Sequence, residues 1–165
     1  MRALVVGVLV LSACASAPPP KPLPGGPLTV SLPIWSTDQK HSFADDRGHI
    51  VVIDAWATWC APCRAQLPEL DALAKQWAAQ GVRVYAVSID TDVNAVGPFL
   101  LTLRLDLPVL LDPGAAVLTP TLGLQDMPTT WVVDPGGHVV LAEHGSTIAA
   151  VTAKVNLMLA SPARP

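Results

Sequence analysis

The chain has 165 residues, of which 51% are hydrophobic and 14% are charged, and its net charge at pH 7 is −3. This length supports one domain with a sizeable core, so a second full domain is not expected. Acidic and basic residues are interspersed without a run of either sign. The charge pattern therefore excludes nucleic acid as an expected partner and gives no electrostatic attraction to an anionic membrane surface.

The amino terminus has the pattern of an export signal. Arg2 provides a positive charge, residues 3–11 are apolar, and Leu-Ser-Ala-Cys at residues 11–14 ends the run. The run is too short for a transmembrane helix, which needs about 20 apolar residues. The segment resembles the lipobox of a bacterial lipoprotein, which implies that Cys14 becomes the lipid-bearing first residue of the mature protein. The alternative is an ordinary signal peptide with an incidental cysteine.

Cysteine usage favours the lipid assignment. An exported protein with three cysteines has one thiol left over after a single pairing. If Cys14 carries lipid and Cys60 pairs with Cys63, no thiol remains unexplained.

These features divide the chain into three parts. We predict a lipoprotein signal peptide over residues 1–13, a Pro/Gly-rich tether over residues 14–27 and a folded domain over residues 28–165. The predicted location is extracytoplasmic, on the periplasmic face of a bacterial membrane. The residue after the cysteine is Ala15 and not an aspartate, and this favours the outer membrane in a Gram-negative host.

From residue 28 the pattern is that of an α/β domain. Apolar or alternating runs predict strands at residues 28–32, 41–43, 50–54, 82–89, 108–111, 129–133 and 138–142. Helical spacing predicts a helix from about Pro62 to a glycine stop at Gly81, a second from Pro98 to residue 105, and a third over residues 148–159 capped by Ser146 or Thr147. Residues 45–48 and 134–137 are predicted turns.

The pentapeptide Trp59-Cys60-Ala61-Pro62-Cys63 places two thiols between a predicted buried strand and the first helix. The spacing suits reversible thiol-disulfide exchange. At the start of a helix, Cys60 would face free amide groups and the positive end of the helix dipole, both of which favour thiolate over thiol. The sequence thus predicts a nucleophile that needs no cofactor beyond a redox-active disulfide.

The order of elements and three motifs resemble the TlpA-like branch of the thioredoxin superfamily, periplasmic and membrane-tethered thiol-disulfide reductases that include cytochrome c maturation proteins. The resemblance covers residues 27–159. Its motifs are Trp-Ala-Thr-Trp-Cys-Ala-Pro-Cys-Arg at residues 56–64, Pro68, and Met-Pro-Thr-Thr at residues 127–130. It implies a thioredoxin-like α/β fold of three layers, in which helices flank a central mixed sheet and an amino-terminal hairpin is added.

The resemblance also assigns roles to residues. It implies that Cys60 is the attacking thiol and Cys63 the resolving thiol, and that Pro128 follows a cis peptide bond and lies against the dithiol. No metal site is expected. The residues expected to contact substrate are Met127, Pro128, Trp59, Ala61 and Pro62.

Asp54 lies six residues before Cys60 on the strand that leads into the site. In thioredoxin itself an acid at the matching place is buried beneath the resolving cysteine and handles its proton, whereas many TlpA-like proteins lack it. Burial without a partner would raise the pKa of this carboxyl toward the range useful for acid-base chemistry. The alternative is a structural acid bonded to a backbone amide.

Together these features predict a lipid-anchored thiol-disulfide oxidoreductase. It would reduce disulfides of extracytoplasmic proteins and take its electrons from a membrane-embedded donor. No charge lies between the two cysteines, which disfavours a strongly oxidising couple, although Arg64 acts weakly in the other direction. Two alternatives stay open: a copper-delivery module that adds a distant histidine, here His144, and a peroxide-reducing enzyme. The spacing of two residues between the cysteines counts against the copper module, which usually has three.

Overall fold

The computed structural model describes residues 25–161. The predicted signal peptide, the lipid-bearing Cys14 and most of the predicted tether lie outside these residues. Within the described part of the chain, no helix combines the length and the apolar character that crossing a bilayer requires.

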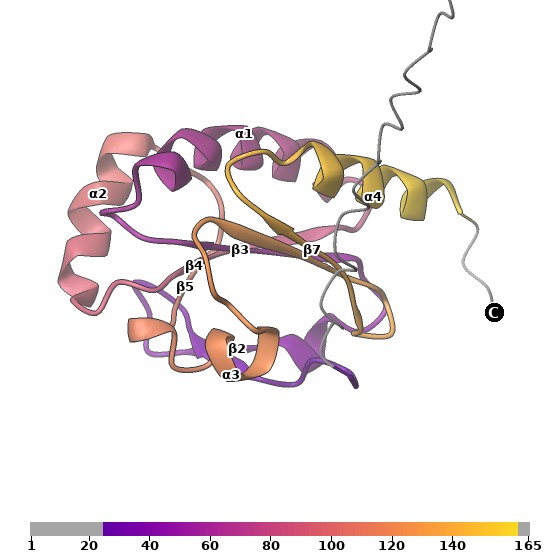
Figure 1. Ribbon diagram of the computed structural model, residues 1–165, viewed down its shortest axis with the longest axis horizontal. Helices are drawn as coiled ribbons and strands as arrows, with labels where there is room; N and C mark the ends of the chain where they lie inside the picture. The colour runs from indigo at the N-terminus through magenta and orange to yellow at the C-terminus, as the bar shows by residue number, and fades with distance from the viewer. Residues whose placement is uncertain (1–24, 162–165) are drawn as a thin grey trace, which may run out of the picture.

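A mixed sheet of five strands forms the middle layer of the domain (Figure 1). Its order is β5-β4-β3-β6-β7. The central strand, β3 (Val51–Trp56), is parallel to β4 (Arg83–Ser88), which in turn is parallel to β5 (Val109–Leu111). On its other side β3 is antiparallel to β6 (Thr129–Val133), which pairs with β7 (Val139–His144) in an antiparallel hairpin. The predicted strands and the turn at residues 134–137 are thus confirmed.

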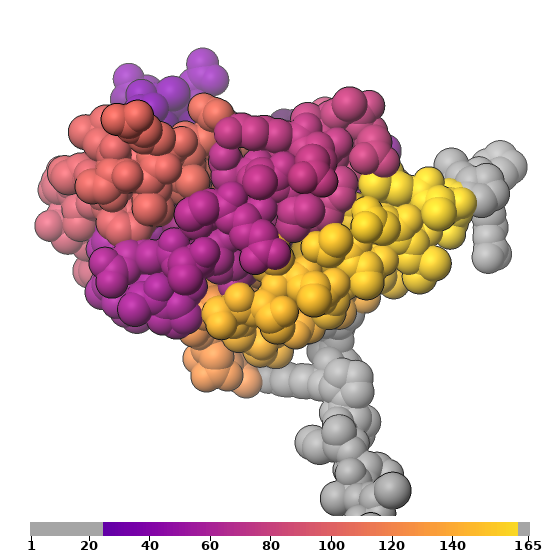
Figure 2. Space-filling view, turned by 90° about the horizontal axis from the view of Figure 1, so that it is seen from above, coloured from indigo at the N-terminus to yellow at the C-terminus, as the bar shows by residue number. Residues whose placement is uncertain are grey.

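Three helices cover one face of the sheet: α1 (Ala61–Ala78), α2 (Val96–Leu103) and α4 (Ala149–Ala160). The helices α1 and α4 run side by side over this face in both views (Figures 1 and 2). Their apolar stripes meet the sheet in one core. Its buried members include Val52, Trp56, Cys60, Cys63, Leu67, Leu70, Trp77, Val96, Leu100, Val151 and Val155.

The opposite face carries the predicted amino-terminal hairpin and a short helix (Figure 1). The hairpin consists of β1 (Ser31–Pro33) and β2 (Lys40–Ser42), and the helix is α3 (Leu118–Leu122). A second core fills this layer, with buried side chains that include Leu32, Phe43, Val51, Ile53, Ala55, Leu118, Leu122 and Trp131. The three layers confirm the predicted fold class.

The alternation along β3 decides which side chains reach the site. All six residues of β3 are buried, as expected for a central strand covered on both faces. Val52 and Trp56 enter the core under α1, whereas Ile53 and Ala55 enter the other core. Because successive side chains point to opposite faces, Asp54 lies on the α1 face with Val52 and Trp56.

Several elements differ from the sequence prediction. The strand predicted at residues 28–32 is β1 over Ser31–Pro33, and α4 has Ile148 as its N-cap residue without a side-chain cap, where Ser146 or Thr147 was expected. The helix α2 begins at Val96, two residues before Pro98, because proline is tolerated anywhere in a first turn that needs no N–H partner. The predicted turn at residues 45–48 begins earlier, as a 3-10 helix over Phe43–Asp46. The helix α3 was not predicted, since five residues with a central proline carry no helical period. It is started by the Asp112 carboxylate, which accepts hydrogen bonds from the N–H groups of residues 117 and 118 at 2.9 and 2.8 Å.

Candidate active site

The two thiols lie at the amino terminus of α1, and in this structure they form a disulfide with 5.3 Å between their Cα atoms. Cys60 is the N-cap residue of the helix, and Pro62 lies in the first turn. The N–H of Cys63 points at the Cys60 sulfur, with a nitrogen to sulfur distance of 3.3 Å. After reduction the same N–H group and the positive end of the helix dipole would stabilise a thiolate on Cys60.

The two sulfur-bearing residues differ in access. Cys60 is 5% exposed, whereas Cys63 is completely buried beneath the first turn of α1. Next to them Trp59 is 67% exposed, and Ala61 and Pro62 also lie at the surface. The three residues predicted to meet substrate around the dithiol are therefore available to a partner, and Cys60 is the more accessible sulfur.

Trp56, the first tryptophan of the motif, does not reach the surface around the dithiol. It is fully buried in the core under α1, and its ring packs against Phe99 of α2 with 5.3 Å between ring centroids. Trp56 is buried because its side chain points from β3 into the core under α1. Trp56 supports the loop from below, whereas Trp59 faces solvent.

The segment before β6 has the geometry that the resemblance implies. The peptide bond between Met127 and Pro128 is cis, and Pro128 is buried. Its carbonyl accepts a hydrogen bond from the N–H of Gly145 at 2.9 Å. Met127 is half-buried and contacts both cores, so it also has a packing role. Within residues 25–161, the backbone N–H and carbonyl of Met127 take part in no hydrogen bond, which leaves them free for an extended peptide.

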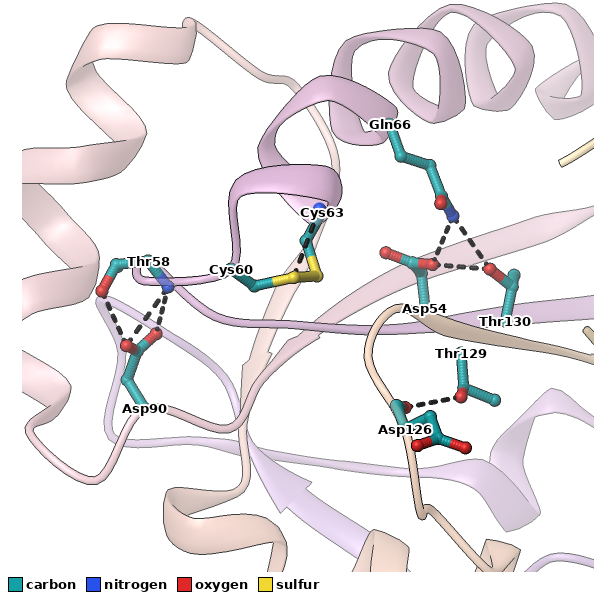
Figure 3. The surroundings of a disulfide bond; sticks show 9 residues. All are labelled: Asp54, Thr58, Cys60, Cys63, Gln66, Asp90, Asp126, Thr129 and Thr130. Atoms are coloured by element: carbon teal, nitrogen blue, oxygen red, sulfur yellow. Dashed lines mark hydrogen bonds between the residues drawn. A yellow bond between two sulfur atoms is a disulfide. The ribbon is translucent and has the colours of Figure 1, made fainter. Parts of the chain in front are cut away.

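Asp54 is fully buried on the α1 face of β3, where it contacts two polar side chains (Figure 3). Its Oδ1 accepts hydrogen bonds from the side-chain amide of Gln66 at 2.9 Å and from the hydroxyl of Thr130 at 2.6 Å. Its Oδ2 has no hydrogen-bond partner among the described residues. Burial raises the pKa of Asp54 to about 7, and the bond from Thr130 opposes this rise. The alternative of an acid held by a backbone amide is wrong, because both donors are side chains.

A second buried acid, Asp90, holds the loop that carries Cys60. Its carboxylate accepts hydrogen bonds from the backbone N–H of Thr58 at 3.0 and 3.2 Å and from the Thr58 hydroxyl at 2.7 Å (Figure 3). Ser88, at the end of β4, donates a further hydrogen bond to it at 2.9 Å. Asp90 is 3% exposed. We call these hydrogen bonds among Thr58, Asp90 and Ser88 the clamp on Thr58. Because Thr58 lies two residues before Cys60, the clamp holds the backbone that leads into the dithiol.

His144 lies beside the cis-proline segment. Its Nδ1 is 3.1 Å from the hydroxyl of Thr129, which itself donates to the carbonyl of Asp126 at 2.7 Å. Because the Thr129 hydroxyl donates its proton to the Asp126 carbonyl, its oxygen can accept a hydrogen bond from Nδ1 in the tautomer that is protonated there. Among residues 25–161, no group of three or more His, Cys, Asp or Glu side chains is arranged to hold a metal ion.

The sequence located the dithiol and Asp54 but not their supports. Gln66 and Thr130 contact Asp54 from 12 and 76 residues away. Gln66 carried one usable signal, since it is a polar residue on the apolar stripe of a helix, next to Leu67 and one turn from Leu70. Asp90 comes two residues after the end of β4, and its sequence position alone does not identify Thr58 as its partner.

The sheet order, the disulfide at the start of α1 and the cis-proline before β6 together define a thioredoxin-like protein with a dithiol site. Sequence comparison agrees with this class. The chain belongs to the AhpC/TSA family, whose pattern matches residues 28–142. The predicted membership of the thioredoxin superfamily is thus confirmed.

Curated relatives include the thiol-disulfide oxidoreductase ResA of Bacillus subtilis (strain 168), which is 32% identical over 103 residues. This match covers 62% of the chain and 57% of the relative. ResA of Geobacillus thermodenitrificans (strain NG80-2) is 32% identical over 101 residues, covering 61% of the chain and 58% of the relative. The chain therefore spans less than two thirds of the length of these relatives.

Solved structures confirm the fold. A candidate thiol:disulfide interchange protein DsbE from Chlorobium tepidum superimposes with a TM-score of 0.73 at 26% identity, covering 79% of this chain and 93% of that one. StoA from Bacillus subtilis superimposes with a TM-score of 0.67 at 18% identity, covering 81% and 99%. The likeness to StoA concerns the fold alone.

Proposed function

We propose that this protein is a thiol-disulfide oxidoreductase that reduces disulfides of extracytoplasmic proteins. The observation that carries the proposal is the Cys60–Cys63 disulfide at the amino terminus of α1, in which the Cys63 N–H points at the Cys60 sulfur. This arrangement stabilises a thiolate at the more accessible sulfur and keeps a second thiol within bonding distance. The ResA relatives are named thiol-disulfide oxidoreductases, which supports the reaction class.

The reaction uses two exchanges of sulfur partners. The Cys60 thiolate attacks one sulfur of a substrate disulfide, and the other substrate sulfur leaves with the electron pair of the broken bond. Cys63 then loses its proton and attacks the Cys60 sulfur. The substrate sulfur that was bonded to Cys60 leaves with the electron pair of that bond. The substrate has then gained two electrons, and the protein contains the Cys60–Cys63 disulfide.

Asp54 is the acceptor that we assign to the proton of Cys63. It is the buried acid on the α1 face of β3, and a pKa of about 7 lets it both take up and release a proton near neutral pH. Its Oδ2 is free of hydrogen bonds among the described residues and, in the view of Figure 3, is turned toward the side of the disulfide.

The substrate is assigned to the surface around Cys60. Trp59 offers an exposed aromatic side chain, and aromatic residues dominate the energetics of protein contacts. The free backbone N–H and carbonyl of Met127 can pair with an extended peptide next to Pro128. Such backbone pairing gives affinity with little dependence on sequence.

A reductase in an oxidising compartment must be returned to the dithiol state. We assign this step to a membrane-embedded electron donor, because each reduction of a substrate leaves the Cys60–Cys63 couple oxidised. The absence of a charged residue at Ala61 and Pro62 supports a couple on the reducing side of strong oxidants.

The test of this function is a reduction assay combined with measurement of the redox potential. Pre-reduced protein should reduce a model disulfide such as insulin, and the Cys60/Cys63 couple, equilibrated in dithiothreitol buffers, should have a potential closer to roughly −270 mV than to roughly −120 mV. The Cys60→Ser variant is the control. Peroxide turnover without insulin reduction, or tight copper binding that Cys60→Ser abolishes, would favour one of the two alternatives.

Attachment to a membrane through Cys14 is the proposed location. The support is the short apolar run that ends in Leu-Ser-Ala-Cys and the proline-rich stretch that follows it. We expect Cys14→Ser to remove labelled fatty acid from the protein and to release it from the membrane fraction, with the reduction activity unchanged. Wild-type protein that takes up no label would remove the support for a lipid anchor.

A further inference from the structure

Gln66 of α1 joins the two side chains that surround the carboxyl group of Asp54. This glutamine is 2% exposed, although it belongs to α1 between surface positions and the apolar stripe. Its side-chain nitrogen lies 2.9 Å from Asp54 Oδ1 and 3.0 Å from the hydroxyl oxygen of Thr130. The Thr130 hydroxyl lies 2.6 Å from the same Oδ1. The three side chains thus form a closed triangle of hydrogen bonds (Figure 3).

The direction of each bond in this triangle follows from the donors present. The Gln66 amide has two hydrogens, one for Asp54 Oδ1 and one for the Thr130 oxygen. The single hydroxyl hydrogen of Thr130 must then point to Oδ1. When Asp54 is ionised, the reverse orientation of the amide would place the Gln66 carbonyl oxygen against the carboxylate, which is repulsive. One arrangement therefore satisfies all three donors.

This arrangement leaves Asp54 Oδ2 as the only place for a proton. Oδ1 already accepts two hydrogen bonds, whereas Oδ2 is buried and has no partner within residues 25–161. The oxygen of the Gln66 amide is likewise buried without a partner there. A neutral Asp54 thus carries its proton on the oxygen that the triangle does not occupy.

We propose that Gln66 is a positioning residue that, with Thr130, holds Asp54 Oδ1 so that only Oδ2 exchanges a proton with Cys63. The inference rests on the proposed role of Asp54 in thiol-disulfide exchange. Gln66 follows Cys63 by one turn on α1, and Thr130 follows Pro128 by two residues on β6. The triangle therefore ties the acid on β3 to the two elements that carry the resolving cysteine and the substrate segment.

The charged and titratable surroundings of Asp54 are few. From α1 the titratable neighbour is Cys63, and on β4 the residue paired with Asp54 is Ala86. On β7 Glu143 pairs with Thr130 and so lies on the same face of the sheet. The hydrogen bond from Thr130 lowers the pKa of Asp54 and so favours its anion, and the Gln66 amide donates to the same oxygen.

The test removes the Gln66 amide without opening a cavity. Gln66→Met keeps the side-chain volume but has no hydrogen bond to offer, and Gln76→Met on the exposed side of the same helix is the matched control. Loss of a donor to a charged oxygen should raise the pKa of Asp54 by roughly one unit. In Gln66→Met we expect two midpoints to rise together: that of the Asp54 carboxyl titration, which NMR measures, and that of the pH dependence of mixed-disulfide resolution. Neither midpoint should shift in Gln76→Met.

A double variant separates this inference from the proposed function. In the background of Asp54→Asn, Gln66→Met should change neither the rate nor the pH profile of resolution. If Asp54→Asn abolishes the pH dependence but Gln66→Met leaves the midpoint in place, the positioning role is wrong and the role of Asp54 stands. If Asp54→Asn itself leaves resolution unchanged, the role of Asp54 fails as well.

Thr130 offers an independent check should Gln66→Met fold poorly. Thr130→Val removes the second donor at nearly constant volume, whereas Thr130→Ser retains the hydroxyl. We expect Thr130→Val to raise the Asp54 pKa and Thr130→Ser to restore it toward the wild-type value. Equal midpoints in the two Thr130 variants would contradict the proposal.

Discussion

Replacing Cys63 with serine should convert the protein into a trap for its substrates. The Cys60 thiolate can still attack a disulfide, but without the second sulfur the mixed disulfide has no internal route to resolution. Cys60→Ser should instead lose exchange by a factor on the order of 1,000 or more, since it removes the nucleophile. Non-reducing electrophoresis and mass spectrometry of the adducts measure both outcomes.

The difference in access between the two sulfurs is the basis of this expectation. Cys60 retains some exposure, whereas Cys63 is completely buried. A double variant with serine at both positions is the control and should form no adduct. If Cys60→Ser trapped as much substrate as Cys63→Ser, the assignment of attacking and resolving thiols would have to be abandoned.

Asp54→Asn should raise the free energy of unfolding in alkaline solution and slow resolution of the mixed disulfide. The carboxyl has a pKa of about 7 in the folded protein and about 3.9 in an unfolded chain. Between these values the folded state binds more protons at Asp54 than the unfolded state, so the contribution of Asp54 to stability falls as the pH rises and is fully lost above pH 7. Asparagine keeps an oxygen for Gln66 and Thr130 without this loss.

The stability difference between Asp54→Asn and wild type should therefore be near zero below pH 4 and grow to on the order of 4 kcal/mol above pH 7. Resolution at pH 8 should be slower by on the order of 100-fold, because Cys63 loses its proton acceptor. Urea unfolding at several pH values and stopped-flow exchange measure the two effects. A loss of stability with an unchanged exchange rate would return Asp54 to a structural role.

Much of the fold could be predicted because its signals are local. The buried strand before the dithiol, the stripe of α1 and the turn at residues 134–137 all follow from neighbours in sequence. Even the positive φ of Gly81, at 77°, was predictable from a glycine after a helical pattern, although α1 itself ends at Ala78. The helix α3 was not predicted because it is too short to show a helical period. Hydrogen bonds to the Asp112 carboxylate hold its first turn instead.

The supports of the site could not be predicted in the same way. The bond between Thr130 and Asp54 joins residues 76 apart, and the bonds between Thr58 and Asp90 join residues 32 apart. Nothing in the local pattern of Thr58 or Thr130 distinguishes them from ordinary polar residues, and the position of Gln66 on the apolar stripe of α1 does not identify its partners. Their roles arise only when the sheet brings β3, β4 and β6 together.

The clamp on Thr58 bears on the entropy of the redox couple. None of its hydrogen bonds involves either sulfur, and all end on Asp90, which Ser88 in turn fixes to the end of β4. The loop before Cys60 is therefore ordered by side chains that the opening of the disulfide leaves untouched. Ordering a backbone residue costs roughly 1–2 kcal/mol. If the loop is held in the same way in the oxidised and the reduced protein, its conformational entropy does not change when the disulfide opens. The temperature coefficient of the potential then reports chiefly solvent reorganisation and proton uptake at the two sulfurs.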